Sequence, residues 1–403
     1  MNHKRYFISF INLKRKMGLT KTLGFILKRL LVKGKTGSPL GTGKINVNEF
    51  YRFIYDVPFG QSQVDYPEVV TWIIPDFGIG SGGHLNIFRM IYFLERSGIK
   101  CHVNIDEACH FSRGEDARES IRKHFFPVQS DVTIGRDALR PSVITVATSW
   151  TTAYTVRDFQ ATANKFYFVQ DYEPYFYSKG SEYQFAEDTY SFGLKAITAG
   201  SWLSDKLSKE FGMEAHPFGF SFDKQLYKRA IKRDKKKRVF FYSRPVTCRR
   251  GFELGLLVLE EVTKKLPELE IVFAGWDSSG YEIPFPYLNA GVLSLPELPD
   301  LYAQCDVALV ISFTNLSLLP LELMACGCVV VSNKGKNVEW LLNEEIAVLA
   351  DANVKALSGA LIDVLNESGK RNDLSAAGEQ FALNTSWEAE AQKVAGIFKK
   401  HLE

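Results

Sequence analysis

The sequence lacks the cysteine pattern of a disulfide-stapled or zinc-binding protein. Its six cysteines are scattered over 403 residues without a C-x-x-C pair, and Cys326 and Cys328 are too close together for a zinc knuckle. Scattered cysteines of this kind are usually reduced thiols of the cytosol. No apolar run reaches the roughly 18 residues of a membrane-spanning helix, and charges interrupt the region where a secretory signal needs an apolar core. We therefore expect a cytoplasmic protein.

Net charge is also nearly absent, because 49 Lys and Arg face 46 Asp and Glu. This balance gives no reason to expect nucleic acid as a partner. The distribution is uneven, since residues 1–35 hold ten Lys or Arg and no acidic residue. Apolar residues recur at helical spacing over 19–31, with lysines on the other side. Peripheral contact with the anionic inner face of a membrane explains this segment as well as packing on its own domain does.

Apolar strands alternate with helices in two separate series. The first series opens with a strand at 69–74, a Gly-rich loop at 77–83 and a helix at 84–97, and the second opens with a strand at 238–243. Continuous apolar strands are typical of parallel sheets that are buried on both faces. No repeat of 20–50 residues occurs. We predict an α/β protein of two Rossmann-like, doubly wound domains that face each other across a cleft.

The predicted organisation has four parts. Residues 1–45 form the basic N-terminal segment and a linker, 46–230 the first Rossmann-like domain, 231–385 the second, and 386–403 a C-terminal helix. The charge run at 231–238 is expected to be a solvated linker between the domains.

Two shorter features are also predicted from local signals. Ser201 is a plausible N-cap for the helix that follows it, and a short strand is expected near 291–295.

Ligands of open α/β sheets bind beyond the carboxyl ends of the strands, so the segments that follow strands hold the candidate residues. The first such segment is FGIGSGGHLN, where Gly82 and Gly83 allow a phosphate to approach the backbone at a helix start. It is not a P-loop, because the G-K-[ST] ending is missing. A tight turn between strand and helix is the alternative. His84 either orients a substrate or bonds locally at the helix start.

Asp171 ends the predicted strand 165–171. A carboxylate there could accept the proton of an attacking hydroxyl, and the aromatic residues after it could form a platform for an acceptor sugar. The alternative is a loop carboxylate that caps a turn over packed aromatic side chains.

Three arginines follow strand 238–243, in the turn SRPVTCRRGF: Arg244, Arg249 and Arg250. Guanidinium groups oppose the positive end of the helix dipole, and a bound diphosphate would compensate for that. A solvated basic turn is the alternative. The spacing does not decide which of Arg249 and Arg250 contacts phosphate.

The strongest signal is ISFTNLSLLPLELMACG, where a strand passes through a turn into a short helix. Amides at Ser317 and Leu318 could bind a phosphate, and the carboxylate of Glu322 could accept hydrogens from a vicinal diol. A glutamate that only stabilises the helix dipole is the alternative. No D-x-D motif follows an early strand, so we expect no metal.

These motifs together resemble the GT-B glycosyltransferases of family 4. The order RRG, VFAG, LPDLYAQCDVALVIS and NLSLLPLELMACG is similar to their nucleotide-sugar-binding half, and SWEAEAQKVAGIF to the final helix that crosses back to the first domain. FVQDYEPYFY, FYSRP and RRGFELG are similar to the WsaF-type rhamnosyltransferases of surface-layer glycan assembly. The resemblance runs from about residue 70 to the end and is most specific in the second half.

The resemblance implies an activity. A retaining, metal-independent transferase without a cofactor would move L-rhamnose from dTDP-β-L-rhamnose onto a growing surface-glycan or lipid-linked acceptor. The first domain would bind the acceptor and the second the nucleotide sugar.

The positions after strands and the resemblance together assign roles to the candidate residues. Asp171, Glu322 and Arg249 would be catalytic. The family has two glutamates eight residues apart; Glu322 is the second, and Thr314 stands at the position of the first. The substrate-binding residues would be Gly82, Gly83, His84, Arg244, Arg250, Thr314, Asn315, Ser317 and Leu318.

Two other functions remain open from the sequence. One is a GT-B transferase that uses a UDP- or GDP-hexose in polysaccharide synthesis. The other is a non-catalytic, membrane-associated scaffold of glycan assembly, against which the retained arginines and Glu322 argue.

Overall fold

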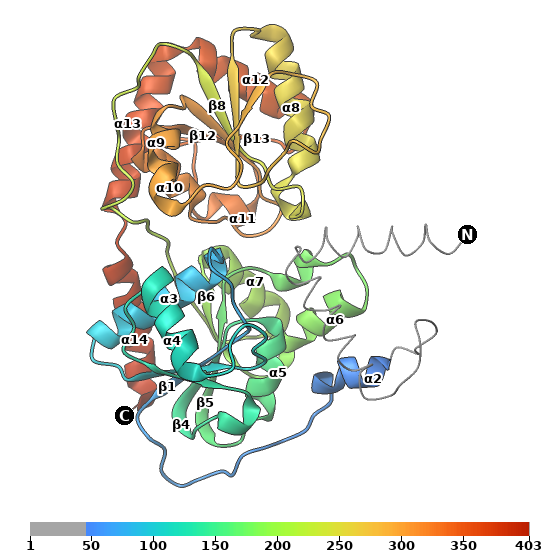
Figure 1. Ribbon diagram of the computed structural model, residues 1–403, viewed down its shortest axis with the longest axis vertical. Coiled ribbons are helices and arrows are strands. Elements are labelled where there is room, and N and C mark those ends of the chain that lie inside the picture. Colours follow the sequence, from blue (N-terminus) through green and yellow to red (C-terminus); the bar gives the residue numbers. More distant parts are fainter. Residues whose placement is uncertain (1–45, 403) are drawn as a thin grey trace.

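The computed structural model describes residues 46–402. The predicted basic segment and its linker, residues 1–45, lie outside the described residues. Two α/β domains stand one above the other along the long axis of the molecule (Figure 1). Every pair of neighbouring strands in the two described sheets is parallel. This confirms the predicted fold class of two parallel, doubly wound domains.

The first domain is built on a seven-stranded sheet with the order β3-β2-β1-β4-β5-β6-β7. Its strands are β1 (Val70–Ile74), β2 (Cys101–Ile105), β3 (Asp131–Ile134), β4 (Ser142–Ala147), β5 (Thr162–Val169), β6 (Lys195–Ala199) and β7 (Ala215–Phe218). Its helices are α2 (Val47–Phe50), α3 (Gly82–Arg96), α4 (Gly114–His124), α5 (Trp150–Asp158), α6 (Ser181–Asp188) and α7 (Ser201–Phe211). The strand order reverses between β1 and β4, where such sheets open a crevice at their carboxyl edge.

The second domain repeats the plan with a six-stranded sheet of order β10-β9-β8-β11-β12-β13. Its strands are β8 (Arg238–Tyr242), β9 (Glu270–Ala274), β10 (Tyr287–Asn289), β11 (Val307–Val310), β12 (Val329–Asn333) and β13 (Val348–Ala350). Its helices are α8 (Phe252–Lys265), α9 (Leu298–Ala303), α10 (Leu319–Ala325), α11 (Lys336–Glu339), α12 (Val354–Asn366) and α13 (Ser368–Asn384). The switch point of this sheet lies between β8 and β11.

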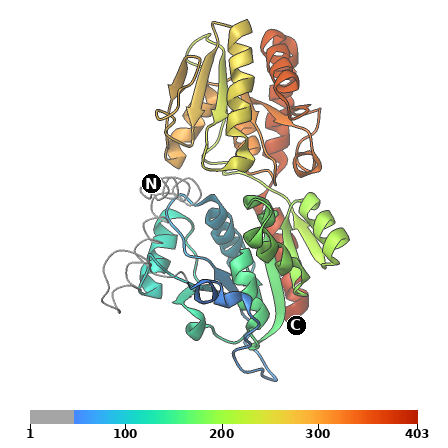
Figure 2. The same ribbon diagram turned by 90° about the vertical axis from the view of Figure 1, so that its right-hand side faces the viewer.

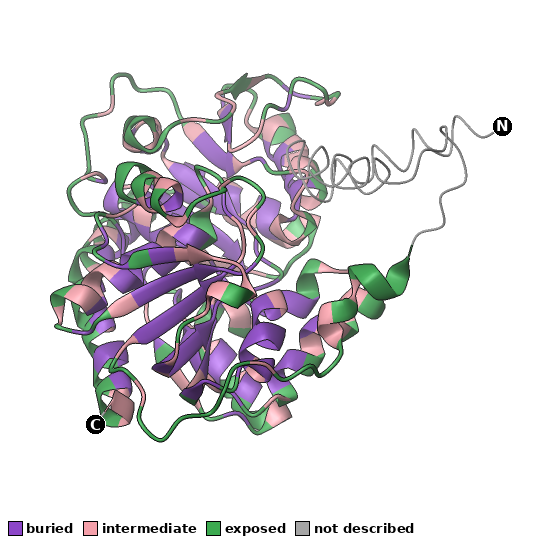
Figure 3. Cartoon of the chain, turned by 60° about the horizontal axis from the view of Figure 1, so that its bottom comes forward, coloured by how far each residue is buried: buried purple, intermediate pink, exposed green. Residues whose placement is uncertain are grey.

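The last helix, α14 (Trp387–Leu402), leaves the second domain and runs down the side of the first (Figures 1 and 2). Its Phe398 is fully buried, with its ring 5.2 Å from that of Phe166 and 6.1 Å from that of Trp72. The end of the described chain is thus part of the core of the first domain. In Figure 3 the strands are buried along most of their length, and helices cover them.

Two local predictions are wrong by a few residues. The short strand near 291–295 is instead β10 at Tyr287–Asn289, because pairing with β9 rather than local composition fixes its position. The N-cap of α7 is Gly200 and not Ser201, which is the first helical residue. Gly200 has φ of 90°, a conformation that side chains disfavour.

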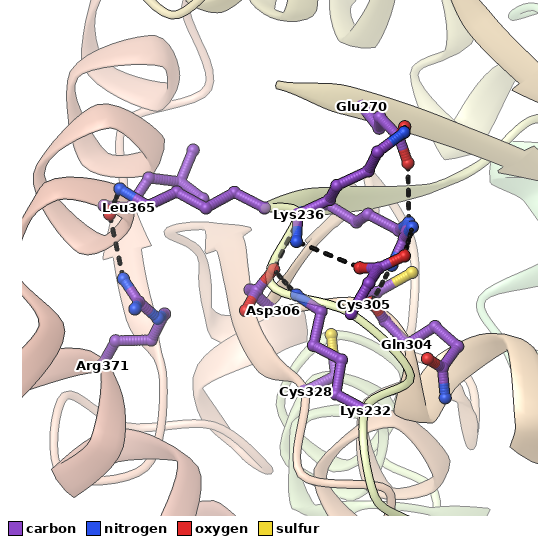
Figure 4. A network of polar contacts seen from close by, with 12 residues as sticks. Lys232, Lys236, Glu270, Gln304, Cys305, Asp306, Cys328, Leu365 and Arg371 are labelled. Carbon is purple, nitrogen blue, oxygen red and sulfur yellow. Dashed lines mark hydrogen bonds and ion pairs between the residues drawn. The ribbon is translucent and has the colours of Figure 1, made fainter. Parts of the chain in front are cut away.

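The charge run at 231–238 is solvated as predicted, with only Lys232 and Arg238 half-buried, but it is also bound to the second sheet. Asp306 accepts hydrogen bonds from Lys232 Nζ at 2.5 Å and from the Arg238 amide at 2.8 Å. Arg238 also pairs with Asp234 and Glu270, at 2.7 and 2.8 Å. Figure 4 shows this network at the amino ends of the strands, with Lys232, Asp306 and Glu270 converging from separate segments. The basic residues therefore fix the linker to the second sheet.

Candidate functional site

The carboxyl edges of the two sheets meet around Asp171, which follows β5. Its Oδ2 accepts a hydrogen bond from the Thr314 hydroxyl at 2.8 Å, and its Oδ1 accepts from the Asn315 amide at 2.8 Å. The Tyr172 amide donates to the same Oδ1 at 2.8 Å. Asp171 is only 8% exposed. A carboxylate of the first domain is thus enclosed by the loop that follows β11 in the second.

Arg249 approaches the same carboxylate from the turn after β8, within the short helix η5 (Cys248–Arg250). Its Nε lies 3.6 Å from Asp171 Oδ2, and its guanidinium lies 3.9 Å over the ring of Phe176. The Nε is buried and makes no hydrogen bond to the described residues. Burial lowers the pKa of Arg249, and the charge of Asp171 partly opposes this. The Arg249 side chain as a whole is 28% exposed, and a half-buried guanidinium with so few oxygen partners is suited to receive an anion.

The other two arginines of the turn have different surroundings. Arg250 donates hydrogen bonds to Ser312 Oγ at 2.6 Å and to the Asn315 carbonyl at 3.1 Å. It therefore supports the loop after β11 from below. Arg244 is exposed and donates to the Tyr242 hydroxyl at 3.0 Å. Of the three arginines, Arg249 is the one whose guanidinium faces the other domain.

The side chain of Asn315 is hydrogen-bonded to other residues of the protein through both its Nδ2 and its Oδ1. The side-chain Nδ2 of Asn315 donates to the carbonyls of Gln170 and Ala199, at 3.0 and 2.7 Å. The side-chain Oδ1 accepts from Trp340 Nε1 at 2.7 Å. Both amide hydrogens are thereby used, and the side chain is buried. Asn315 was predicted to bind substrate; the structure shows it joining the domains.

Glu322 lies in the first turn of α10 and is half-buried. Burial raises its pKa to about 7, and Arg89 and Tyr227 work in the opposite direction. Arg89, on α3 of the first domain, is itself 6% exposed and lies over the ring of Trp387 at 4.6 Å. Burial lowers the pKa of Arg89 to about 10, and Glu322 is the largest opposing influence. The carboxylate that the sequence singled out thus lies within the field of a buried arginine.

The Gly-rich loop is bonded largely within itself. His84 has Nδ1 at 2.8 Å from Ser81 Oγ and Nε2 at 3.1 Å from the Pro75 carbonyl. The Gly83 carbonyl accepts a hydrogen bond from Gln170 at 3.2 Å. A Cβ at Gly82 would meet no atom within 4 Å, so this position has open space. The structure therefore favours the local role for His84 and leaves room for a ligand beside Gly82.

Ser317 and Leu318 connect the Asn315 loop to α10. Ser317 lines a small enclosed cavity of about 10 Å³ together with Arg250, Tyr242 and Leu319. That volume is at the lower limit for one water molecule. A phosphate group could enter here only if the surrounding loops moved apart.

Sequence reasoning missed three buried or paired groups near these edges. Glu173 accepts hydrogen bonds from the Trp150 amide at 3.1 Å and the Tyr167 hydroxyl at 2.7 Å, and burial raises its pKa to about 7. Asp76 lies on the loop after β1 and His110 on the loop after β2, and Asp76 Oδ2 is 2.5 Å from His110 Nδ1. Arg89 could have been found, because it is a lone charge within the apolar stretch NIFRMIYFL. The other contacts depend on the fold.

No group of three or more His, Cys, Asp or Glu in residues 46–402 is arranged to hold a metal ion. None of the helices in this range has the length and apolar character needed to cross a membrane.

Comparison with known protein families gives two matches along this chain. The model described as "WsaF, C-terminal domain" matches residues 237–362, and that described as "WsaF, N-terminal domain" matches residues 129–199. The O-antigen biosynthesis protein RfbC of Myxococcus xanthus is 34% identical over 339 residues. These cover 81% of this chain but 26% of RfbC, so the chain spans about a quarter of the length of that relative.

Solved structures share the fold at low sequence identity. Sucrose-phosphate synthase from Thermosynechococcus elongatus has a TM-score of 0.62 at 12% identity, covering 83% of this chain and 99% of that one. HepE from Anabaena, solved in complex with UDP, has a TM-score of 0.64 at 14% identity, covering 82% and 99%. At such identities the likeness establishes the two-domain architecture.

Proposed function

Because this chain is a WsaF-type member of the GT-B glycosyltransferases, we propose that it transfers a sugar from a nucleotide-sugar donor to a glycan during the assembly of a surface polysaccharide. The name of RfbC, an O-antigen biosynthesis protein, supports the polysaccharide context. The described residues would supply donor binding in the second domain and acceptor binding in the first.

The observation that carries this proposal is the state of Arg249. Its Nε is buried and makes no hydrogen bond within residues 46–402, and the carboxylate of Asp171 is 3.6 Å away. It lies at the carboxyl edge of the second sheet, where ligands of such folds bind. A diphosphate would supply the missing oxygens and neutralise the cation through charge-assisted hydrogen bonds.

The proposed donor is dTDP-β-L-rhamnose, and the proposed outcome is retention at the anomeric carbon. The support is the WsaF-type wording of the sequence around Asp171 and Arg249 together with the two matching family models. Glu322 would accept hydrogens from donor hydroxyls, and Thr314 would take a weaker polar role beside the sugar. Ser317 and Leu318 would offer backbone amides to the diphosphate.

In the proposed reaction an acceptor hydroxyl oxygen bonds to the anomeric carbon while the bond from that carbon to the diphosphate oxygen breaks. The leaving diphosphate keeps the electron pair, and Arg249 neutralises its charge. The hydroxyl proton passes to the leaving phosphate on the same face of the sugar, with Asp171 orienting the acceptor. Enclosure between the domains would exclude water and limit hydrolysis of the donor.

Residues 1–35 are proposed to hold the protein at an anionic membrane surface, close to a lipid-linked acceptor. The support is their ten basic residues without an acidic one.

The proposal is tested by incubating the full chain with dTDP-β-L-rhamnose and a panel of short rhamnosides, some lipid-linked. We expect a product whose new linkage, analysed by NMR, keeps the configuration of the donor. Arg249→Gln should abolish most of the transfer. Transfer only from UDP- or GDP-hexoses would replace the proposed donor. Neither transfer nor hydrolysis with any of these donors would overturn the enzymatic function in favour of a scaffold.

A further inference from the structure

Asp171 stands next to the cation that is assigned above to the donor diphosphate. The distance of 3.6 Å between Arg249 Nε and Asp171 Oδ2 is that of an ion pair without a hydrogen bond. The Asp171 side chain is only 11% exposed, so its charge is poorly screened by water. In the ligand-free chain it is an internal anion beside Arg249.

The contacts of Asp171 differ in strength. Hydrogen bonds of 2.8 Å from the Thr314 hydroxyl, the Asn315 amide and the Tyr172 amide hold the carboxylate in place. None of these bonds involves Arg249. The arginine can therefore turn to another anion while Asp171 stays fastened to the loop after β11.

The guanidinium of Arg249 can therefore change its ion-pair partner. Its guanidinium lies 3.9 Å over the Phe176 ring, a contact that does not require a partner oxygen. Two phosphate groups offer more negative charge and more acceptor oxygens than one carboxylate, in a geometry that matches the guanidinium fork. A nucleoside diphosphate should thus displace Asp171 as the ion-pair partner of Arg249.

We propose that Asp171 is a positioning residue that holds Arg249 in the donor-free protein and yields it to the diphosphate of the donor. This inference rests on the proposed function. The internal ion pair keeps the arginine turn of the second domain attached to the first. The negative charge of Asp171 also remains beside the bound diphosphate and repels it. Asp171 therefore lowers the affinity for the diphosphate and favours release of the nucleoside diphosphate after transfer.

Other roles of Asp171 predict different binding. A carboxylate that accepted donor hydroxyls would strengthen donor binding, so its removal would weaken affinity. A carboxylate that served only to fasten the domains would change thermal stability and leave affinity unchanged. Binding of dTDP, which cannot react, separates these roles from any contribution to turnover.

The test is isothermal titration of the full chain with dTDP and, separately, with inorganic pyrophosphate. Asp171→Asn removes the charge and keeps an oxygen that can accept from the Asn315 amide. We expect both ligands to bind about fivefold more tightly to this variant, the effect of one ion pair of ordinary strength. Asp171→Ser, which also lacks the charge, should shift affinity in the same direction and guards against misfolding of the amide variant.

The matched control is Asp116→Asn, which removes one carboxylate from the exposed pair with Arg113 on α4. Its affinity for dTDP should equal that of the wild type. Unchanged or weaker binding in both Asp171 variants would overturn the inference. A wild-type chain that binds neither dTDP, UDP nor pyrophosphate would instead overturn the proposed function.

Discussion

Trp340 donates a hydrogen bond from its indole Nε1 to Asn315 Oδ1 at 2.7 Å. The same ring packs against Gly200, at the end of β6 in the other domain, where a Cβ would lie 2.5 Å from the ring carbons. Asn315 in turn donates to the Ala199 carbonyl at 2.7 Å. These contacts join the loop after β11 to the first sheet, beside the residues proposed to act on substrate. The geometry of the site therefore depends on Gly200, which has no side chain that could act on a substrate.

Replacing Gly200 by alanine should destabilise the protein for two reasons. An L-residue at φ of 90° is strained by about 1–2 kcal/mol, and the added methyl would displace the Trp340 ring at a further cost of about 1–3 kcal/mol. Gly193→Ala is the matched control, because φ there is 74° but a Cβ would meet nothing within 4 Å. Thermal unfolding should show a Tm several degrees lower for Gly200→Ala than for Gly193→Ala. Equal Tm values would argue against the Trp340 contact.

The architecture could be predicted from the sequence because strands that are buried on both faces of a sheet consist of continuous apolar residues. Continuous apolar strands such as VTWII and VALV predict parallel sheets wherever they occur. The helix α13 was missed, because SGKRNDLSAAGEQFALN has no clear apolar periodicity and is polar along much of its length. The position of β10 was missed because a three-residue edge strand is fixed by its neighbour β9.

The candidate site could be predicted only as a set of strand ends. Asp171 and Asn315 are 144 positions apart, and no local pattern reveals that the one accepts a hydrogen bond from the other. The adjacent Arg249 and Arg250 look alike in sequence, yet one faces the first domain and the other supports the loop beneath it. The local turn geometry of η5 makes this distinction, which the spacing left open.

Arg249 and Arg250 should therefore fail in different ways when each is replaced by glutamine. Arg249→Gln should weaken dTDP binding by about 10- to 100-fold with little change in Tm, since it removes charge-assisted contacts to the ligand. Arg250→Gln should lower Tm, because Ser312 and the Asn315 carbonyl lose a buried donor. Titration and thermal unfolding of both variants check this. The reverse assignment of the two losses would show that Arg250 carries the phosphate.

Deletion of residues 1–35 should reduce binding to vesicles that contain anionic lipid. Ten basic residues without a counter-charge attract such a surface, and added salt should weaken the attraction. Vesicle co-sedimentation at low and moderate salt measures this, with neutral vesicles as the control. If the shortened chain binds anionic vesicles as well as the full chain does, the segment instead packs on its own domain or stays in water.

Stability should depend on pH through Glu173. Burial raises its pKa from an ordinary 4.5 to about 7, so the folded chain holds this proton more tightly than the unfolded chain does. Glu173 therefore costs stability increasingly as pH rises from about 4.5 through about 7. Glu173→Gln removes that cost, and its amide can still accept from the Trp150 amide while donating to the Tyr167 hydroxyl.

The Tm of Glu173→Gln should exceed that of the wild type at pH 8, by an amount that corresponds to about 3 kcal/mol. The advantage should shrink towards pH 5. Glu268→Gln, at an exposed position, serves as the control and should follow the wild type at both pH values. A wild-type chain that is the more stable at pH 8 would contradict the raised pKa of Glu173.

Donor binding should depend on pH through Glu322, and Arg89 should set the range. The pKa of Glu322 is raised by burial to about 7, Arg89 and Tyr227 oppose the rise, and Asp223 adds to it. If the carboxylate form binds donor hydroxyls, the affinity of the wild type for dTDP-β-L-rhamnose should increase between about pH 6 and pH 8. Arg89→Gln removes the opposing charge, so the pKa of Glu322 rises further. Affinity at pH 7 should then fall by about fivefold for a rise of one unit, and recover towards pH 9.

Arg89→Lys keeps the charge beside Glu322 and should restore the wild-type profile in part. Arg96→Gln is the matched control. Arg96 lies on the same helix but is exposed, with its side chain over Tyr92, so its replacement should leave the pH profile unchanged. A loss of packing alone, from the contact between Arg89 and the Trp387 ring, would lower affinity equally at every pH. The shape of the pH profile therefore separates an electrostatic role of Arg89 from a structural one. A uniform loss in Arg89→Gln would show that Glu322 does not bind the donor as a carboxylate tuned from the other domain.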